Sequence, residues 1–163
     1  MHSEYLANLE MLMEIPIFAG LPIEPLKLLT YLCTKESFKP GEILCHQFEV
    51  DAHAYLILEG RVSVLLEEES ERVLGEFGRG EFFGGLSLFW DSKRLFTLKA
   101  ESRVVCLMLS KEKFQKTMEQ FPSMGAIVFR NIAERIHEWE QRFLGEHGRK
   151  CPEYRSCLGV TLI

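Results

Sequence analysis

The residues with the clearest chemistry gather between Gly80 and Thr97. Bare N–H groups at the start of a short helix, here from Gly85 onward, can bind an anion through their unpaired donors and the helix dipole. Arg94 follows closely enough to fold back over the same point and grip phosphate oxygens with its planar fork. The spacing predicts a cradle for one small phosphate-bearing ligand, made by Gly84, Gly85, Leu86, Ser87, Arg94, Leu95 and Thr97.

Arg94 taken alone has a simpler interpretation. An arginine at a strand end is commonly exposed and held in a surface ion pair that contributes little to stability. Its place after Gly84-Gly85-Leu86 and before a hydroxyl favours the phosphate role. We therefore expect Arg94 to be the main ligand-binding side chain.

The segment Gly80-Glu-x-Phe-Gly-x-Leu-Ser-Leu, followed by Arg94-x-x-Thr97, resembles the phosphate-binding cassette of cyclic nucleotide-binding domains. Such domains occur in catabolite-activator and FNR-type regulators, cyclic-nucleotide-dependent kinases and gated channels. The resemblance implies that the cassette amides and Arg94 hold a cyclic phosphate. It also implies a cyclic nucleotide, cAMP or cGMP, as the ligand, with no other cofactor indicated.

The cassette departs from the family pattern at three positions. Gly85 replaces the glutamate that holds the ribose 2′-hydroxyl in the family, Lys93 replaces a proline, and Phe96 replaces a small residue. Loss of a charge-assisted ribose bond removes about 1.5–3 kcal/mol, or about one to two decades of affinity. Two interpretations of Gly85 stay open: a pocket for a different sugar or a non-nucleotide anion, or a decayed pocket that binds nothing.

The elements that must position this cassette follow a helix–strand–helix order. Near-helical spacing of leucines predicts a first helix over 4–13 and a second after Pro22. Several short strands with turn signals between them predict a mainly β fold with flanking helices, either a sandwich or a barrel. The resemblance implies a double-stranded β-helix (jelly-roll) barrel of eight strands. The N-terminal helices resemble those of the same family. The expected strands include 42–45, 54–58, 61–66, 73–77, 96–100 and 103–109.

Helical periodicity returns after the barrel. Ser110 is a plausible N-cap, and Pro122 separates a first helix from a long one. The long helix carries an apolar stripe that packs either on its own barrel or against a second copy, as in the family's dimers. Arg135 is expected to reach the ligand or Asp91. Trp139 is either a ligand contact or, as an aromatic residue on an apolar stripe, part of the core or dimer seam. The stripe comprises Met124, Val128, Ile132, Ile136, Trp139 and Phe143.

These patterns predict one domain over 1–144 and a tail over 145–163. Helices occupy 4–33, the barrel 35–109 and the C-terminal helices 110–144. The tail lacks a helical period, so it is a loose end or one added edge strand. No helix-turn-helix module follows the long helix, so we expect no DNA binding by the chain itself.

Composition points to a reduced, cytoplasmic compartment. The 163 residues carry a net charge of −5 and no basic block, so no nucleic-acid surface is indicated. No apolar run reaches 18 residues, and the N-terminus does not resemble a signal peptide, so no membrane partner is expected. The five cysteines are unevenly spaced, and three of them, Cys33, Cys45 and Cys106, lie in apolar runs that favour core positions.

Other chemistry has weaker support. His46, His53 and His137 match no metal-ligand spacing, so no metal is expected, and a redox pair of Cys151 and Cys157 has no further support. No nucleophile with a matched base is found, so the chain is not expected to be an enzyme. We predict a regulatory domain that senses a phosphate-bearing ligand and forms a homodimer through the long helix. The alternatives are an interaction module with a vestigial pocket and a haem or redox sensor.

Overall fold

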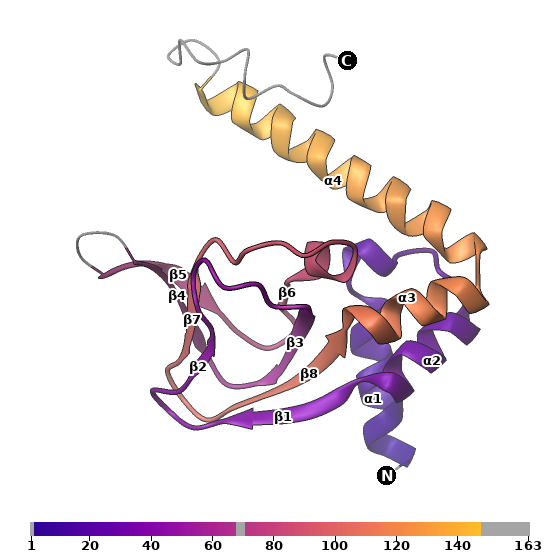
Figure 1. Cartoon of the computed structure of the whole chain (residues 1–163), viewed down its shortest axis with the longest axis horizontal. Coiled ribbons are helices and arrows are strands. Elements are labelled where there is room, and N and C mark those ends of the chain that lie inside the picture. Colours follow the sequence, from indigo (N-terminus) through magenta and orange to yellow (C-terminus); the bar gives the residue numbers. More distant parts are fainter. Residues whose placement is uncertain (1, 68–70, 148–163) are drawn as a thin grey trace.

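The structure, a computed structural model, describes residues 2–67 and 71–147 (Figure 1). Its eight described strands form two antiparallel four-stranded sheets, with the orders β1-β8-β3-β6 and β2-β7-β4-β5. Consecutive strands lie in opposite sheets, except for β4 and β5, which pair directly with each other. This is the jelly-roll arrangement that the resemblance to the family implied. The strands are β1 (Thr34–Phe38), β2 (Ile43–Cys45), β3 (His53–Glu59), β4 (Val62–Glu67), β5 (Glu71–Phe77), β6 (Phe82–Phe83), β7 (Thr97–Ala100) and β8 (Val104–Ser110).

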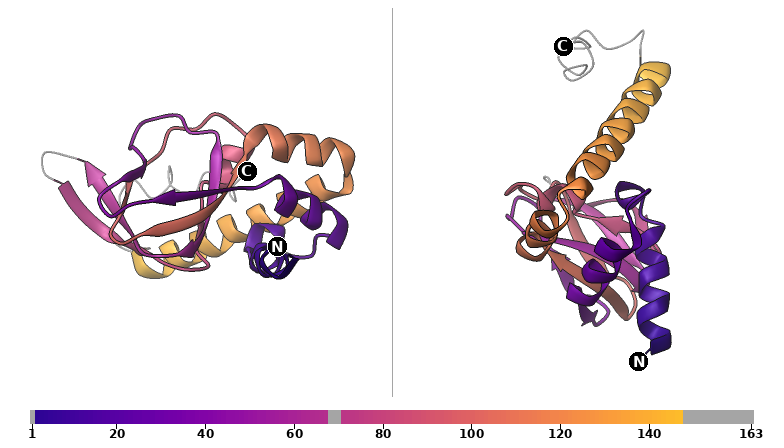
Figure 2. Two further views of the ribbon diagram at one scale, coloured as in Figure 1. Left: turned by 90° about the horizontal axis from the view of Figure 1, so that it is seen from below. Right: turned by 90° about the vertical axis from the view of Figure 1, so that its right-hand side faces the viewer.

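Helices gather at one end of the sheets (Figures 1 and 2). Ser110 caps the third helix as predicted, because its hydroxyl accepts a hydrogen bond from the backbone N–H of Lys113 at 3.3 Å. The sequence did not predict the two-residue strand β6 or the single turn η1, which are too short to show a period. The helices are α1 (His2–Met13), η1 (Pro16–Phe18), α2 (Ile23–Leu32), η2 (Gly85–Leu88), α3 (Lys111–Gln120) and α4 (Ser123–His147).

Two apolar clusters hold the fold together. One fills the space between the two sheets and includes Tyr55, Phe83 and Leu98. The other joins the helices to the outer face of the first sheet, with Phe18 and Phe114 fully buried. Burying each such aromatic side chain contributes about 1.5–3 kcal/mol. The cassette, from Gly80 to Leu88, passes between these clusters and is held from both sides.

The apolar residues of the long helix α4 are fully buried only near its start, although Glu140 further along is also buried. Met124 and Val128 are fully buried, and the Asn131 side chain donates hydrogen bonds to the carbonyl oxygens of Ile17 (3.1 Å) and Ala19 (2.8 Å). Beyond that anchor α4 projects past the other helices (Figure 2), and Trp139 is 50% exposed. The predicted stripe therefore packs on the domain over its first half only.

The expected boundary at residue 144 falls inside α4, which runs to His147. The predictions for the tail beyond it, including the Cys151–Cys157 pair, lie outside the described residues. Among the helices that the structure describes, none combines the length and apolarity needed to cross a lipid bilayer.

Candidate functional site

A loop between β2 and β3 fixes the backbone around Arg94. The N–H of Arg94 donates to the Glu49 carbonyl at 2.9 Å, and the N–H of Phe48 donates to the Arg94 carbonyl at 2.8 Å. Phe48 has a φ of +67°, a left-handed conformation that glycine adopts more easily. The family that the cassette resembles often has a glycine in this loop, where this chain has Phe48. The pairing aims the Arg94 side chain at the start of β3.

The Arg94 guanidinium points inward and is only 7% exposed. Its Nη2 donates to Asp51 Oδ2 at 2.8 Å and to the His53 carbonyl oxygen at 2.5 Å. Its central carbon lies 5.7 Å from the ring centroid of Tyr55, in range of a cation–π contact. The buried Nε has no hydrogen-bond partner. One donor of the fork is thus left unused in a place where an unpaired donor costs about 1–3 kcal/mol.

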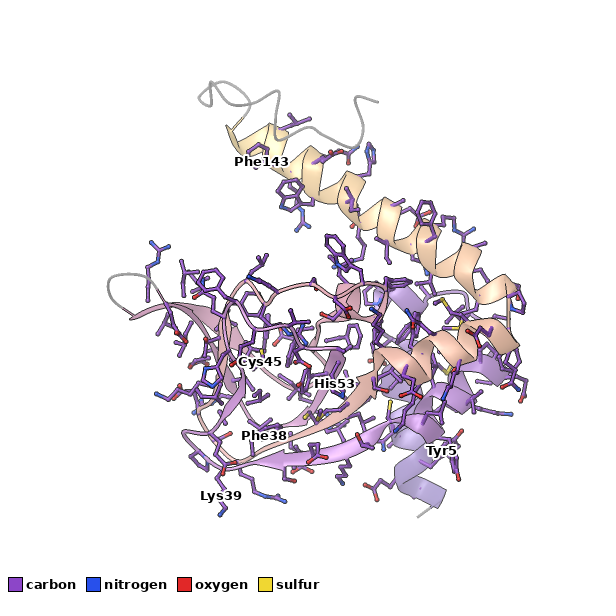
Figure 3. The ribbon with its side chains drawn as sticks, viewed as in Figure 1. Tyr5, Phe38, Lys39, Cys45, His53 and Phe143 are labelled. Carbon is purple, nitrogen blue, oxygen red and sulfur yellow. The ribbon has the colours of Figure 1, made fainter. Side chains whose placement is uncertain are left out.

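Asp51 is the counter-ion of Arg94. Its carboxylate also contacts His53 Nδ1 at 2.8 Å and accepts a hydrogen bond from the Tyr55 hydroxyl at 2.8 Å (His53 is labelled in Figure 3). Burial raises the pKa of Asp51, but the hydrogen bonds from Arg94, His53 and Tyr55 outweigh it, and the net pKa is lowered. Burial and the neighbouring carboxylate raise the pKa of Tyr55. At neutral pH the site therefore holds an ionised Asp51 against a charged Arg94.

Gly84 lets the cassette backbone meet Arg94. Its φ of +79° is left-handed, and a Cβ there would overlap Arg94 Nη1 and lie 2.7 Å from the His53 carbonyl oxygen. Only glycine satisfies both conditions. The following turn η2 starts at Gly85, and its first N–H groups have no carbonyl partner within the turn. The predicted pairing of the cassette start with Arg94 is present in the structure.

The remaining residues of the predicted cradle have different surroundings. Thr97 is buried, where its hydroxyl accepts from the N–H of Gln47 at 2.9 Å and donates to the Glu67 carboxylate. Ser87 is buried, and its hydroxyl lies 3.2 Å from that of Ser92. Leu86 and Leu95 are both exposed. Thr97 therefore joins a network beside Arg94, and Leu95 presents its side chain to solvent.

Aromatic side chains pack around Tyr55, the residue whose ring Arg94 contacts. Tyr55 stacks on Phe83 with ring centroids 4.8 Å apart, and Phe83 stacks on Phe77 at 5.9 Å. Phe96 meets Phe77 edge-on at 6.4 Å. Phe96 therefore extends an aromatic cluster between the sheets, at the position where the family has a small residue.

The surroundings of Gly85 are apolar. A Cβ at this position would lie 3.0 Å from Phe82 Cε1 and 3.2 Å from Ile17 Cδ1. The place of the family's glutamate is thus closely bordered by two apolar side chains. A carboxylate side chain would have to displace them.

A cleft of about 590 Å³ lies between η1, the cassette and α4. Arg135 and Trp139 both line it, so the structure brings them together with Gly84, Gly85 and Leu86. Asp91, the other predicted partner of Arg135, instead pairs with Lys111 at 2.8 Å. Arg94 does not line the cleft. The lining residues are Ile15, Pro16, Ile17, Gly80, Glu81, Phe82, Phe83, Gly84, Gly85, Leu86, Ile132, Arg135, Ile136, Trp139 and Arg142.

Sequence reasoning missed Asp51 and Arg142. Asp51 lies 43 positions before Arg94, in a polar loop with no motif of its own. Arg142 could have been found, because it follows Arg135 by seven residues and so falls on the same face of a helix.

Metal and thiol chemistry find little support among the described residues. They contain no group of three or more histidine, cysteine or acidic side chains that could hold a metal ion. Burial raises the pKa of Cys33 and Cys106 to about 12 and that of Cys45 to about 11. Thiols with such values stay protonated and react slowly at neutral pH.

Comparison with known proteins identifies the family. The family model described as the cyclic nucleotide-binding domain matches residues 35–121, which is more than half of the chain. The chain belongs to the cyclic nucleotide-binding domain family. A match of this extent agrees with the jelly-roll sheets and with the Gly84–Arg94 arrangement.

Relatives of this domain occur in larger proteins. The chain is 26% identical over 125 residues to a cGMP-dependent protein kinase from Eimeria tenella, covering 77% of this chain and 12% of the kinase. It is 29% identical over 110 residues to a lysophospholipase nte1 from Neosartorya fischeri, covering 66% of this chain and 7% of that protein. The chain thus spans a small part of the curated relatives it matches.

Solved structures give the same fold. The N-terminal domain of a transcriptional regulator from Streptomyces coelicolor A3(2) has a TM-score of 0.75 and 26% identity, covering 82% of this chain and 95% of that one. The catabolite activator protein of Thermus thermophilus has a TM-score of 0.65 and 24% identity, covering 78% of this chain and 61% of that one. The matches support a regulatory domain of the cyclic nucleotide-binding family.

Proposed function

We propose that this chain is a non-catalytic sensing domain that binds a phosphate-bearing small molecule at Arg94 and signals through α4. The observation that carries this proposal is the buried Arg94 guanidinium, which lies against the Gly84 backbone with its Nε unpaired. A guanidinium fork with a spare donor suits a phosphate, which presents several acceptor oxygens at once. A cyclic nucleotide is the first ligand to test, because the family match points to it.

A phosphate bound at Arg94 would compete with the carboxylate of Asp51. Its carboxylate already accepts from Arg94 Nη2 at 2.8 Å, so a phosphate must compete with an internal anion for the same donors. Displacing Asp51 also releases the hydrogen bonds that it shares with His53 and Tyr55. Ligand binding is therefore linked to a rearrangement at the start of β3, which can shift the balance between two states of the domain.

The second half of α4 is suited to report that rearrangement. The helix is anchored at Asn131 to η1, while Trp139 in the part that follows is 50% exposed and lines the cleft opposite the cassette. A movement of the cassette changes the packing under Ile132 and Ile136, and the helix direction changes with it. The output is a new position of the exposed end of α4.

The test is titration calorimetry of the full chain with cAMP, cGMP and inorganic phosphate. We expect at least one of them to bind, and Asp51→Asn to tighten that binding about tenfold because a competing charge is removed. Arg94→Lys keeps the charge but loses the fork, so it should weaken binding. Arg103→Lys is the matched control, since Arg103 is exposed and lies outside the site.

Two outcomes would reject the proposal. One is that none of the three compounds binds to the chain or to Asp51→Asn at millimolar concentration. The other is that Arg94→Lys binds as tightly as the unchanged chain. Circular dichroism of each variant checks that the fold is kept.

A second candidate function is assembly through α4. Phe129 is 74% exposed and Trp139 50% exposed, although both lie on a helix of a folded domain. We propose that a second copy covers this helix in a homodimer, since exposed aromatic residues commonly mark protein interfaces. Sedimentation equilibrium tests it: we expect a dimer that Phe129→Glu dissociates, and a monomer at all concentrations would reject the dimer.

A further inference from the structure

The two loop segments that hold Arg94 form a short ribbon with a second, outward face. Val50 and Lys93 make an antiparallel bridge, so residues 48 and 95 lie opposite each other in the same register. The N–H of Phe48 donates to the Arg94 carbonyl at 2.8 Å, which extends the pairing to that level. Side chains alternate between the two faces of such a ribbon, and the Arg94 guanidinium is directed inward. Its neighbours on either side therefore point outward.

The outward face of the ribbon is apolar, and the described residues leave it largely uncovered. Phe48 is 63% exposed, Val50 56% and Leu95 74%. Phe48 also has the left-handed φ of +67°, which is rare for a bulky residue, and yet its ring lies at the surface. Neighbouring exposed apolar side chains commonly mark a place where another segment or molecule binds.

A segment of this same chain is long enough to reach that face. Residues 148–163 follow α4 and lie outside the described part of the structure. Trp139 borders the cassette, and α4 continues from there to His147, a further ~12 Å of helix. An extended chain covers about 3.3 Å per residue, so Leu158 can lie up to about 36 Å from the end of α4. Figure 1 shows α4 extending over the side of the sheets along which the chain passes from η2 to β7, the part that contains the ribbon.

The end of that segment has the chemistry to cover an apolar ribbon. Its sequence over 158–163 is Leu-Gly-Val-Thr-Leu-Ile. In an extended conformation, alternate side chains share one face, so Leu158, Val160 and Leu162 lie together. Removing these side chains and those of the ribbon from water stabilises a contact between them.

The chain that leads to this apolar end is basic, whereas the chain beside the ribbon is acidic. Glu67 donates its N–H to the side-chain oxygen of Gln47 at 2.6 Å, directly before Phe48 in the sequence. An acidic run thus begins at the edge of the ribbon, and opposite charges favour an approach of the two segments. The acidic run comprises Glu67, Glu68, Glu69 and Glu71, and the basic residues of the tail are Arg149, Lys150 and Arg155, with Glu153 as its single carboxylate.

We propose that residues 158–163 dock on the outward face of this ribbon within the same chain. Their alternate apolar side chains cover Val50 and Leu95, and the basic residues before them lie toward the acidic run that begins at Glu67. The contact is separate from the phosphate site, because Arg94 points to the other side of the ribbon. It brings the chain that follows α4 back onto the loops between the strands.

Disulfide formation by the native thiol of Cys157, next to the apolar end, tests this contact. Lys93→Cys places a second thiol on the outward face of the ribbon. Arg103→Cys is the control, because Arg103 is exposed and pairs with the far end of β3. Both are made in a Cys151→Ser background and equilibrated with glutathione, which gives the effective concentration of the thiol pair. We expect a value at least about tenfold higher for Lys93→Cys.

Substitutions on the ribbon test its apolar face. Val50→Ser with Leu95→Ser should reduce the effective concentration for Lys93→Cys to that of Arg103→Cys. Both side chains are exposed, so the fold should be kept, and circular dichroism checks this. Phe48 is left unchanged, because its left-handed backbone responds to substitution by itself.

A matched pair in the tail tests the docking segment. Leu162→Glu should lower the effective concentration at least about tenfold, because it places a charge on the apolar side of the segment. Thr161→Glu adds the same charge on the opposite side of an extended chain and should leave the value nearly unchanged. The pair separates apolar docking from the attraction between the basic tail and the acidic run.

Three results would overturn the inference. The first is an equal effective concentration for Lys93→Cys and Arg103→Cys. The second is a Leu162→Glu chain that behaves like Thr161→Glu. The third is a disulfide that joins two copies, read by mass spectrometry of mixed isotope-labelled and unlabelled chains, which would assign the ribbon face to a contact between copies.

Discussion

The two faces of the cassette differ in how the charges of their arginines are balanced. On the face toward β3, Arg94 is buried and its charge is balanced inside the protein by Asp51. On the face toward α4, Arg135 and Arg142 border a largely apolar cleft that Glu81 also lines, and among the described residues neither arginine has a carboxylate within 4.0 Å. A phosphate bound at the first face, as proposed, would have to displace an internal anion, whereas the arginines of the second face have no described ion-pair partner to displace. The first face is thus suited to switching, because a competing anion there would change which groups are paired.

The largest effect is expected where the two faces meet. Gly84→Ala places a Cβ on Arg94 Nη1 and on the His53 carbonyl, so we expect a loss of about 3–4 kcal/mol of stability. Gly80→Ala is the control, because Gly80 has a similar φ of +87° but open space around it, and about 1 kcal/mol is expected. Urea unfolding measures both. Equal losses would show that Arg94 does not press on the cassette.

The next effect concerns the face toward β3, where the free energy of unfolding should depend on pH through Asp51. Because the pKa of Asp51 is lowered in the folded state, its charge contributes stability above the unfolded value of about 3.9. That contribution is lost as the pH falls through the folded pKa. Asp51→Asn should therefore cost about 2 kcal/mol at pH 7 and close to nothing near pH 2. Urea unfolding at a series of pH values tests this, and a difference that stays constant with pH would argue against an ionised Asp51.

A smaller effect on stability is expected on the face toward α4. Gly85→Ala should cost about 1–2 kcal/mol, because the methyl group presses on Phe82 and Ile17. Gly125→Ala, in the first turn of α4 with open space around it, should be neutral or stabilise by up to about 1 kcal/mol. Thermal unfolding compares the two. A stabilising Gly85→Ala would mean that Phe82 and Ile17 leave enough space for a methyl group.

The smallest effect concerns the loop that positions Arg94. Phe48→Gly relieves the left-handed strain at φ +67° but raises the entropy of the unfolded chain, so we expect a net gain of about 0.5 kcal/mol. Phe48→Ala keeps the strain and should not stabilise. A shift in the thermal midpoint measures this, and a loss of stability in Phe48→Gly would show that the exposed ring has packing partners.

The sequence predicted the parts of the site that depend on neighbours along the chain. Gly84 and Arg94 belong to one short segment, so their pairing follows from a motif and a turn. Asp51 could not be found, because it reaches Arg94 from a loop far away in sequence and carries no signal of its own. The surroundings of Gly85 were equally hidden, since Ile17 comes from the other end of the domain.

The amino-acid sequence by itself determined the order of the elements, a mainly β fold, the helix cap at Ser110 and the cassette, because periodicity, turns and caps are local properties of the chain. The jelly-roll arrangement was implied by the resemblance of the cassette to the family. The tertiary structure alone decided which anion faces Arg94, what fills the place of the missing glutamate, and how much of α4 is buried. These depend on which distant segments the two sheets bring together, and side-chain charge and volume act there through space rather than along the chain.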